Sequence, residues 1–193
     1  MFEHLRGKIA ESSPAHVVVD INGVGYFVNI SLNTYSQLEG KSEIKIFIHE
    51  NIREDAFNLY GFMDNAERTL FRQLISVSGI GSNTARMMLS SLAPDEIANA
   101  ILTGNVNVLK GIKGIGAKTA QRVIVDLKDK LGKSSLDTKI FASVDNTIRD
   151  EALSALVMLG FTKNSAQKAV DKILTGRPDE KVESVIKQAL KML

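Results

Sequence analysis

The hydrophobic period of this 193-residue chain changes near Asp64, and that change constrains the fold more than any other feature. Before it, apolar residues alternate with polar ones or form short β-branched runs, which is the pattern of half-buried strands. Asn22-Gly23 lies between two such runs and is a strong signal for a hairpin turn. About five short strands in residues 1–63 predict a small closed or nearly closed β-barrel, such as an OB-fold. The clearest candidates are residues 17–21, 24–30, 42–50 and 56–62.

Residues 64–133 have a helical period instead, with apolar residues three or four positions apart. Asp64 and Glu67 have the spacing of a helix capping pair, and an apolar stripe begins at Leu70. The segment is therefore predicted to be an all-helical unit. Its further helices are expected at about residues 82–92, 94–103, 106–109 and 117–131.

The rest of the chain divides in two. Residues 134–145 lose any hydrophobic period and are predicted to form a flexible linker. Three short amphipathic helices, at about 146–159, 164–174 and 178–193, predict a small bundle over residues 146–193. The whole chain is expected to be a multidomain α+β protein of barrel, helical unit, linker and bundle.

The composition excludes several kinds of chemistry. The chain has no cysteine, so it has no Cys-ligated zinc, iron–sulfur cluster or catalytic thiol. Its three histidines show no metal-ligand spacing, and neither a Gly-x-Ser-x-Gly elbow nor a clustered set of carboxylates indicates an active site. No apolar run reaches the roughly 18–20 residues of a membrane span, and the N-terminus is charged. We expect a cytoplasmic binding protein with no catalytic residue, no metal and no cofactor of its own.

Charge is distributed unevenly, although the formal net charge is only +2. Residues 1–63 carry 5 basic and 8 acidic side chains, residues 64–133 carry 10 and 6, and residues 134–193 carry 9 and 8. The positive excess therefore lies in the predicted helical unit, where it favours a polyanionic partner.

A Gly-Ile-Gly turn occurs twice, 35 residues apart, at Gly79–Gly81 and Gly114–Gly116. Each copy follows an apolar lead-in and precedes a Thr-Ala step, which is typical of a helix-hairpin-helix motif. The two glycines let the backbone turn tightly and approach a phosphate, and the N–H groups at the start of the next helix donate hydrogen bonds to it. Such binding touches no base edge, so it is expected to be independent of DNA sequence.

One copy alone could equally be a tight turn between helices, but two copies at a fixed spacing favour a paired grip on both strands of a duplex. Lys118 and Arg122 lie one turn apart on the helix after the second copy and would add positive charge beside its amides. The alternative is that both belong to a solvated helix face. The second copy also resembles a P-loop, but Ala117 separates its last glycine from the lysine and no strand precedes it, so ATP binding is not expected.

Glu54 and Asp55 lie between the last two predicted strands, in a turn that we expect to be exposed. The simpler interpretation is a solvated turn, and the residues alone favour it. In a protein that binds DNA, however, two carboxylates at a strand junction would repel phosphates and keep duplex arms apart.

Further motifs occur from one end of the chain to the other. They are Leu5-Arg6-Gly7, Asn22-Gly23-Val24-Gly25-Tyr26, Arg53-Glu54-Asp55-Ala56, Leu59-Tyr60-Gly61-Phe62, Glu67-Arg68-Thr69-Leu70-Phe71 and Gly114-Ile115-Gly116-Ala117-Lys118-Thr119-Ala120. With the order of barrel, two hairpins, linker and three helices, they make the whole chain similar to the RuvA family. Members of that family are the Holliday-junction-binding subunits of the bacterial RuvAB branch-migration complex.

The resemblance implies a homotetramer, which can double to an octamer, that holds a four-way DNA junction open and square. Glu54 and Asp55 would be its central acidic pin. Ser82-Asn83 stands where family members often have Pro-Lys, so the first hairpin lacks a cation and must rely more on its amides. The residues expected to contact phosphate across the minor groove are Gly79, Gly81, Ser82, Asn83, Gly114, Gly116, Lys118 and Arg122.

The resemblance also implies a motor as partner. The last three helices would be a UBA-like bundle that docks on RuvB, a hexameric ATPase, through Leu156, Leu159 and Phe161. RuvB would use ATP and Mg²⁺ to drive branch migration in recombination and repair, and the RuvC resolvase is a further expected partner. Two other hypotheses are a helix-hairpin-helix nuclease or glycosylase, for which the chain offers no convincing catalytic set, and an adaptor that works through its last three helices alone.

Overall fold

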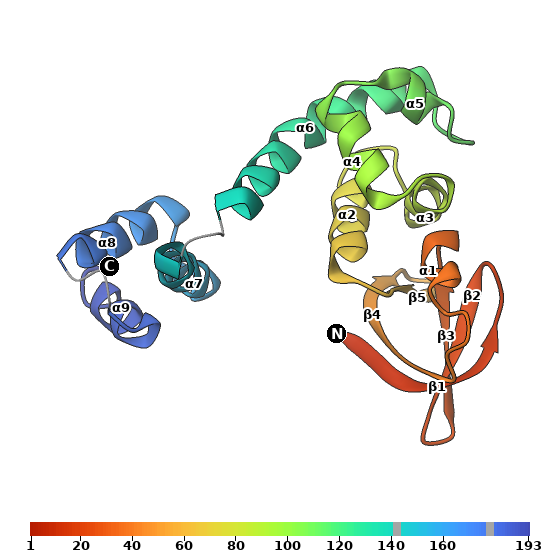
Figure 1. Ribbon diagram of the computed structural model, residues 1–193, viewed down its shortest axis with the longest axis horizontal. Helices are drawn as coiled ribbons and strands as arrows, with labels where there is room; N and C mark the ends of the chain where they lie inside the picture. The colour runs from red at the N-terminus through yellow and green to blue at the C-terminus, as the bar shows by residue number, and fades with distance from the viewer. Residues whose placement is uncertain (141–143, 177–179) are drawn as a thin grey trace. The chain divides into compact units, whose positions relative to one another are not determined.

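The computed structural model describes the backbone of residues 1–140, 144–176 and 180–193, and the side chains of residues 1–132, 148–175 and 180–193. The chain divides into two compact units, Met1–Gly132 and Lys133–Leu193. The first unit contains a barrel and a group of helices, and the second contains the C-terminal helices (Figure 1).

Five strands close into a barrel in the order β1-β2-β3-β5-β4, which confirms the predicted barrel. Strands β3 and β5 are parallel, and the other neighbours are antiparallel. The elements are β1 His4–Ser12, β2 His16–Ile21, β3 Val24–Ile30, α1 Leu32–Ser36, β4 Glu43–Ile52 and β5 Phe57–Phe62. The sequence analysis predicted neither β1 nor α1. Only Leu5 of β1 is buried, and a five-residue helix is too short to show a hydrophobic period.

The turn between β2 and β3 is the one that Asn22-Gly23 predicts. Both residues have left-handed φ angles, +53° and +88°, and Ile21 pairs directly with Val24. The inward-facing side chains of the strands then fill the barrel. Its buried apolar core consists of Leu5, Val17, Val19, Val28, Ile30, Leu38, Ile44, Ile46, Ile48 and Leu59.

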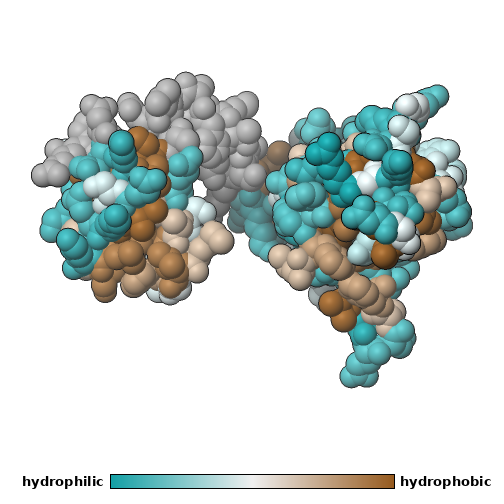
Figure 2. Space-filling model, turned by 90° about the horizontal axis from the view of Figure 1, so that it is seen from below, coloured by the Kyte–Doolittle hydropathy of each residue, from teal (hydrophilic) through white to brown (hydrophobic). Residues whose placement is uncertain are grey.

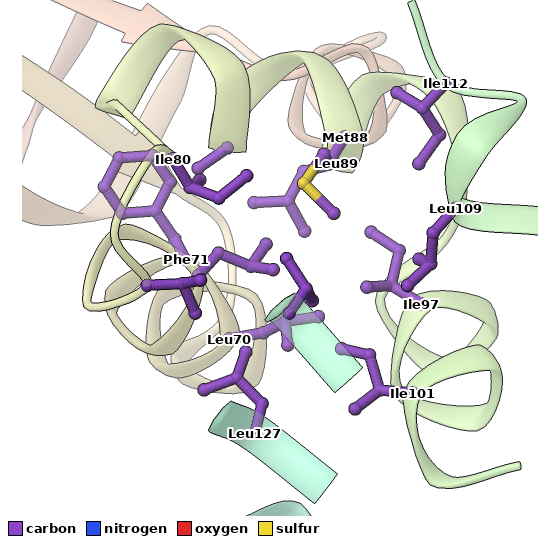
Figure 3. Close-up of a cluster of buried hydrophobic side chains, with 14 of the residues drawn as sticks. Leu70, Phe71, Ile80, Met88, Leu89, Ile97, Ile101, Leu109, Ile112 and Leu127 are labelled. Carbon is purple, nitrogen blue, oxygen red and sulfur yellow. The ribbon is translucent and has the colours of Figure 1, made fainter. Parts of the chain in front are cut away.

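Helices α2 to α6 follow the barrel and share one hydrophobic core (Figure 3). They are α2 Asn65–Ile75, α3 Ser82–Ser91, α4 Pro94–Leu102, α5 Val106–Lys110 and α6 Ala117–Ile140. Helix α2 begins where the capping pair predicts, because the Asp64 carboxylate accepts a hydrogen bond of 2.7 Å from the Glu67 N–H. Among the largest fully buried side chains of the core are Phe71, Leu74, Met88, Leu89, Ile97, Ile101, Leu109 and Leu127.

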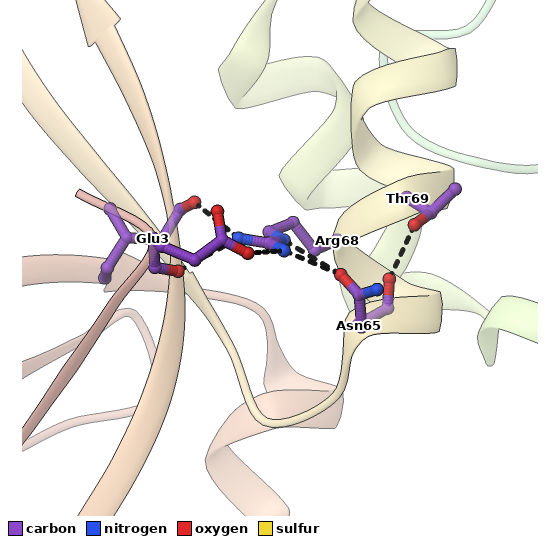
Figure 4. Close-up of polar contacts among 5 residues, drawn as sticks. Glu3, Asn65, Arg68 and Thr69 are labelled. Carbon is purple, nitrogen blue, oxygen red and sulfur yellow. Dashed lines mark hydrogen bonds and ion pairs between the residues drawn. The ribbon is translucent and has the colours of Figure 1, made fainter. Parts of the chain in front are cut away.

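Helix α2 joins the helices to the barrel through two polar side chains, Glu67 and Arg68. The buried carboxylate of Glu67 accepts hydrogen bonds from the hydroxyls of Ser31, at 2.5 Å, and Thr34, at 2.8 Å. The next residue, Arg68, forms an ion pair with the Glu3 carboxylate and donates to the Glu3 carbonyl at 2.9 Å (Figure 4). Barrel and helices are therefore held together as one unit.

The C-terminal unit is the predicted bundle of three helices, each of which contacts the other two. They are α7 Val144–Met158, α8 Lys163–Gly176 and α9 Val182–Ala189. Arg149 of α7 binds both carboxylate oxygens of Asp171 on α8, at 2.6 and 3.1 Å. The buried apolar side chains of the bundle are Ala152, Leu156, Ala166, Ala169, Val170, Ile173, Val185 and Ala189.

The structure differs from the prediction between the two units. The sequence analysis ended the second hairpin helix at Leu131, whereas the backbone of α6 is helical to Ile140 and α7 begins at Val144. Most of segment 134–145, predicted as a linker, therefore has helical backbone, and residues 141–143 lie outside the described residues. The Ser- and Lys-rich segment has no apolar stripe, but such residues are compatible with a helix that continues from a packed one. The flexibility of this segment stays a prediction.

Candidate nucleic-acid interface

The two Gly-Ile-Gly turns adopt the same conformation. The first connects α2 to α3 and the second connects α5 to α6. Gly79 and Gly114 have left-handed φ angles of +94° and +90°, which favour glycine. A Cβ added at Gly79, Gly81, Gly114 or Gly116 would meet nothing within 4 Å, so all four open onto free space. The 35-residue sequence repeat is therefore a structural repeat that exposes its backbone twice.

The isoleucine of each turn is its anchor. Ile80 donates a backbone hydrogen bond to the Val77 carbonyl at 3.0 Å, and Ile115 donates to the Ile112 carbonyl at 3.1 Å. All four side chains are buried in the core of the helical part, where Figure 3 labels Ile80 and Ile112. Each hairpin is therefore a rigid loop that its isoleucine anchors in the core, while its glycines are exposed.

The start of α3 has no side-chain cap. Gly81 occupies the N-cap position and can offer no side-chain acceptor to the first amides of the helix. Helix α2, by contrast, is capped by Asp64, and α5 by the side chain of Asn105. Uncapped amides at the positive end of a helix are donors for an anion that approaches from solvent.

The side chains of Ser82 and Asn83 are turned toward the barrel. Asn51 of β4 donates a hydrogen bond of 2.9 Å to the Ser82 hydroxyl, and the Tyr60 hydroxyl of β5 donates one of 3.2 Å to the Asn83 side-chain oxygen. Ser82 is buried. Tyr60 in turn packs on Phe71 of α2, with ring centroids 5.2 Å apart. Because both side chains contact the barrel, the phosphate contacts predicted for Ser82 and Asn83 are assigned to their backbone amides.

Four cations lie near the hairpins. Lys110 is in the last helical turn of α5, and Lys118 is in the first helical turn of α6. Lys113 lies between these helices, directly before Gly114. All three lysines are exposed. Arg122, also exposed on α6, donates from Nη1 to the Ser78 carbonyl of the first turn at 3.4 Å. This basic surface lies on the same unit as the exposed glycines.

The acidic turn connects β4 to β5 and is exposed as predicted. It is closed by a hydrogen bond of 2.8 Å from the Arg53 N–H to the Ala56 carbonyl, and Glu54 and Asp55 lie at its tip. Asn51, which holds the first hairpin, lies two residues before Arg53 on the chain. The two carboxylates are therefore carried by the same strand pair that contacts the first hairpin.

The apolar residues predicted for partner contact do not share one surface. Leu156 is fully buried in the bundle and Phe161 packs partly buried against the same core, so Leu156 cannot contact a partner; its place in the helical stripe reflects packing. Leu159 is 60% exposed, and Val157 and Met158 beside it are 43% and 86% exposed. Figure 2 shows apolar surface gathered on one face of this unit and bordered by polar side chains. The most exposed apolar segment of this unit is Val157–Leu159; Leu190, Met192 and Leu193 are also partly exposed.

The described side chains do not form the cluster of ligands that a metal site requires. Among the described side chains, those of residues 1–132, 148–175 and 180–193, no group of three or more His, Asp and Glu could hold a metal ion. His49 packs on Phe71 with ring centroids 5.3 Å apart, and burial, aided by Arg72, lowers its pKa. None of the helices in residues 1–140, 144–176 and 180–193 has the length and apolarity that crossing a membrane requires.

Known proteins resemble the chain over its full length. The Holliday junction branch migration complex subunit RuvA of Bacteroides fragilis (strain YCH46) is 55% identical over 201 residues, and proteins of the same name from Bacteroides thetaiotaomicron and Flavobacterium psychrophilum are 55% and 53% identical. Each comparison covers 100% of this chain and 100% of the relative. The chain belongs to the RuvA family.

Family models match each part of this RuvA-family chain. The RuvA N terminal domain matches residues 1–61, a SAM-like helix-hairpin-helix tandem matches residues 71–129, and the RuvA C-terminal domain matches residues 147–193. These ranges correspond to the barrel, to the two hairpins with their helices, and to the three-helix bundle. The fold class and the family resemblance inferred from the sequence are confirmed.

Sequence reasoning missed two sets of residues in this RuvA-family chain. Asn51 and Tyr60 hold the first hairpin on the barrel, but their partners are 31 and 23 residues away, so no local pattern shows the contact. Val157 and Met158, which follow the predicted Leu156, are exposed apolar residues that the prediction did not include. Their separation from the apolar stripe of α7 was a signal in the sequence, since neighbours in a helix point about 100° apart.

Proposed function

We propose that this protein is the Holliday-junction-binding subunit of a branch migration complex. The observation that carries the proposal is the structural repeat: two rigid turns of the same conformation, each with two exposed glycines, in a single compact unit. Family membership supports the same role. The chain itself would carry no catalytic step and bind no cofactor, so its contribution is to hold and shape DNA.

Each hairpin would bind the backbone of DNA rather than its bases. The exposed glycines of a turn allow a phosphate to approach, and the amides at the start of the following helix donate hydrogen bonds to it. Lys118 and Arg122 add charge on the same unit. Because phosphates are alike in every sequence, binding would be independent of sequence and would weaken steeply as salt rises.

The acidic turn would act by repulsion. Glu54 and Asp55 are exposed at the end of the β4–β5 pair, which also contacts the first hairpin through Asn51. DNA bound at the hairpins would therefore bring phosphates toward two carboxylates. The repulsion between them would keep strands apart at the crossover and favour an open, square junction over a stacked one.

A junction has four equivalent arms, so a closed ring of four copies matches its symmetry, and we propose a homotetramer that can double to an octamer around the DNA. The C-terminal bundle would recruit RuvB, a hexameric ATPase that uses ATP and Mg²⁺ to move the strands. The exposed segment Val157–Leu159 is the surface we assign to that contact. RuvC resolvase is a further proposed partner. Because recombination and repair act on the chromosome, we propose the bacterial cytoplasm as the location of the protein.

The test is a binding comparison with the full-length protein. A synthetic four-way junction and a linear duplex of the same sequences are titrated at several salt concentrations, and native mass is measured with and without the junction. We expect tighter binding of the junction, a steep salt dependence and a mass of four or eight copies. Equal affinity for both DNAs would overturn the proposal. Cleavage of either DNA in Mg²⁺ would instead support a helix-hairpin-helix nuclease or glycosylase.

A further inference from the structure

The first hairpin has no cation next to the amides that begin α3. The first turn of α3 contains no charged residue. The first basic residue on that helix is Arg86, whose Nη1 donates a hydrogen bond of 2.8 Å to the Ala15 carbonyl in the β1–β2 turn. The second hairpin, by contrast, has the exposed Lys113 and Lys118. The repeat is therefore symmetric in its backbone and asymmetric in its charge.

Arg122 belongs to the second hairpin by sequence and contacts the first one in space. It lies on α6, yet its Nη1 donates to the Ser78 carbonyl, 44 residues away, at 3.4 Å. Ser78 immediately precedes Gly79, where an added Cβ would meet nothing within 4 Å. The exposed guanidinium thus contacts the backbone of the first turn at the residue directly before its left-handed glycine.

A guanidinium held in this way can still bind an anion. It has five N–H donors, and the contact with Ser78 uses one of them. The remaining donors form a planar fork that matches two oxygens of one phosphate. We propose that Arg122 is the phosphate-binding cation of the first hairpin, supplied by the helix of the second. This inference rests on the proposed binding of junction DNA by both hairpins.

The two hairpins are then coupled rather than independent. The same residue fixes the first turn through its carbonyl and provides the charge that this turn lacks. Loss of Arg122 therefore weakens the first hairpin, and loss of Lys118 weakens the second. A cation placed in the first turn of α3 should replace Arg122 and should not replace Lys118.

The experiment places that cation at Asn83, which is exposed in the first turn of α3. Six full-length proteins are titrated with a four-way junction across a range of salt concentrations. They are wild type, Arg122→Ala and Lys118→Ala, each with and without Asn83→Lys. Arg122→Ala should lower the salt slope by about 0.9 for each subunit in contact with the junction. Asn83→Lys should restore the slope and most of the affinity in the Arg122→Ala protein. In the Lys118→Ala protein it should leave the loss in place.

Asn83→Met in the Arg122→Ala protein is the matched control, because it has a chain of similar reach without the charge. Both substitutions at Asn83 remove the acceptor of the Tyr60 hydroxyl, so they share any effect on folding, which thermal melts report. The inference is overturned if Asn83→Met rescues as well as Asn83→Lys, if Asn83→Lys tightens every protein by the same factor, or if Arg122→Ala binds as wild type does. In those cases wild type still prefers the junction to a linear duplex; loss of that preference would instead overturn the proposed function.

Discussion

Gly79 and Gly81 lie two residues apart in one turn, but only Gly79 has a left-handed backbone, with a φ of +94° against −86°. At both positions an added Cβ would meet nothing within 4 Å. The turn therefore requires glycine at position 79 for its conformation. At position 81 the fold would accept a side chain, so the fold itself does not require glycine there; the phosphate proposed to approach the backbone would.

Two alanine variants separate these reasons. Gly79→Ala should lower the free energy of unfolding by about 1–2 kcal/mol, because a side chain is strained at a left-handed φ. Gly81→Ala should change it by less than about 0.5 kcal/mol, but its methyl group would stand between the amides of α3 and a phosphate. Urea denaturation measures the first effect and titration with a four-way junction the second. Wild-type affinity in Gly81→Ala would contradict phosphate binding at the first turn.

Local signals in the sequence were enough to predict most of the fold. Asn22-Gly23 specifies the β2–β3 hairpin because its turn needs two left-handed residues, and the Asp64 side chain specifies the start of α2. The repeated Gly-Ile-Gly turn specifies both helix hairpins because its first glycine adopts the left-handed conformation that the turn needs. In each case the residues that set the structure lie within a few positions of each other, so a pattern can show them.

Long-range contacts could not be predicted in this way. The spacing of Asp64 and Glu67 suggests a capping pair, in which the Glu67 carboxylate would return to its own helix. That carboxylate instead crosses to Ser31 and Thr34, 36 and 33 residues earlier in the chain. Likewise, a stripe of apolar residues on α7 shows that a face is apolar, but it does not show whether Leu156 is covered by α8 and α9 or by a partner.

Neutralisation of the two carboxylates in the acidic turn should tighten DNA binding. In the double variant Glu54→Gln, Asp55→Asn, each subunit loses two negative charges from the region proposed to face the crossover. We expect higher affinity for a four-way junction and slower RuvB-driven branch migration, because the strands at the centre are no longer held apart. Gel mobility measures the affinity, and strand separation in the presence of RuvB measures the migration.

The matched control removes the same charge elsewhere on the barrel. Glu39 and Glu43 are exposed, and Glu43 is the first residue of β4, at the opposite end of the strand from the acidic turn. Glu39→Gln, Glu43→Gln should change junction affinity little. If the control tightens binding as much as the turn variant does, or if the turn variant binds more weakly than wild type, the carboxylates do not act as a repulsive pin.

The contact of Glu67 with Ser31 and Thr34 should make stability depend on pH. Burial raises the pKa of Glu67 above its ordinary value of 4.5, and the two hydroxyls offset the shift only in part. The folded protein therefore keeps a proton that the unfolded chain has already released. The contribution of this group to stability is fully present below 4.5 and is lost as pH rises through the folded pKa.

Glu67→Gln tests this contribution. Its amide oxygen can accept from Ser31 and its NH₂ group can donate to the Thr34 hydroxyl, so the contacts survive without a titrating group. Urea denaturation of both proteins between about pH 4 and 8 should show the variant gaining stability relative to wild type as pH rises. A difference between the two proteins that stays constant over this range would exclude Glu67 as the source.

The exposed segment Val157–Leu159 should recruit RuvB without stabilising the bundle. Met158 is 86% exposed, so Met158→Ser should change the free energy of unfolding by less than about 0.5 kcal/mol while it reduces RuvB binding and the stimulation of its ATPase. Leu156→Ala should instead destabilise the bundle by about 2–5 kcal/mol, because it leaves a cavity in the core.

Met192→Ser, which changes a methionine that is 48% exposed near the C-terminus, is the control for loss of apolar surface. In all three variants junction binding should persist, since the hairpins lie in the other unit. Full RuvB recruitment by Met158→Ser would show that the motor docks on another surface.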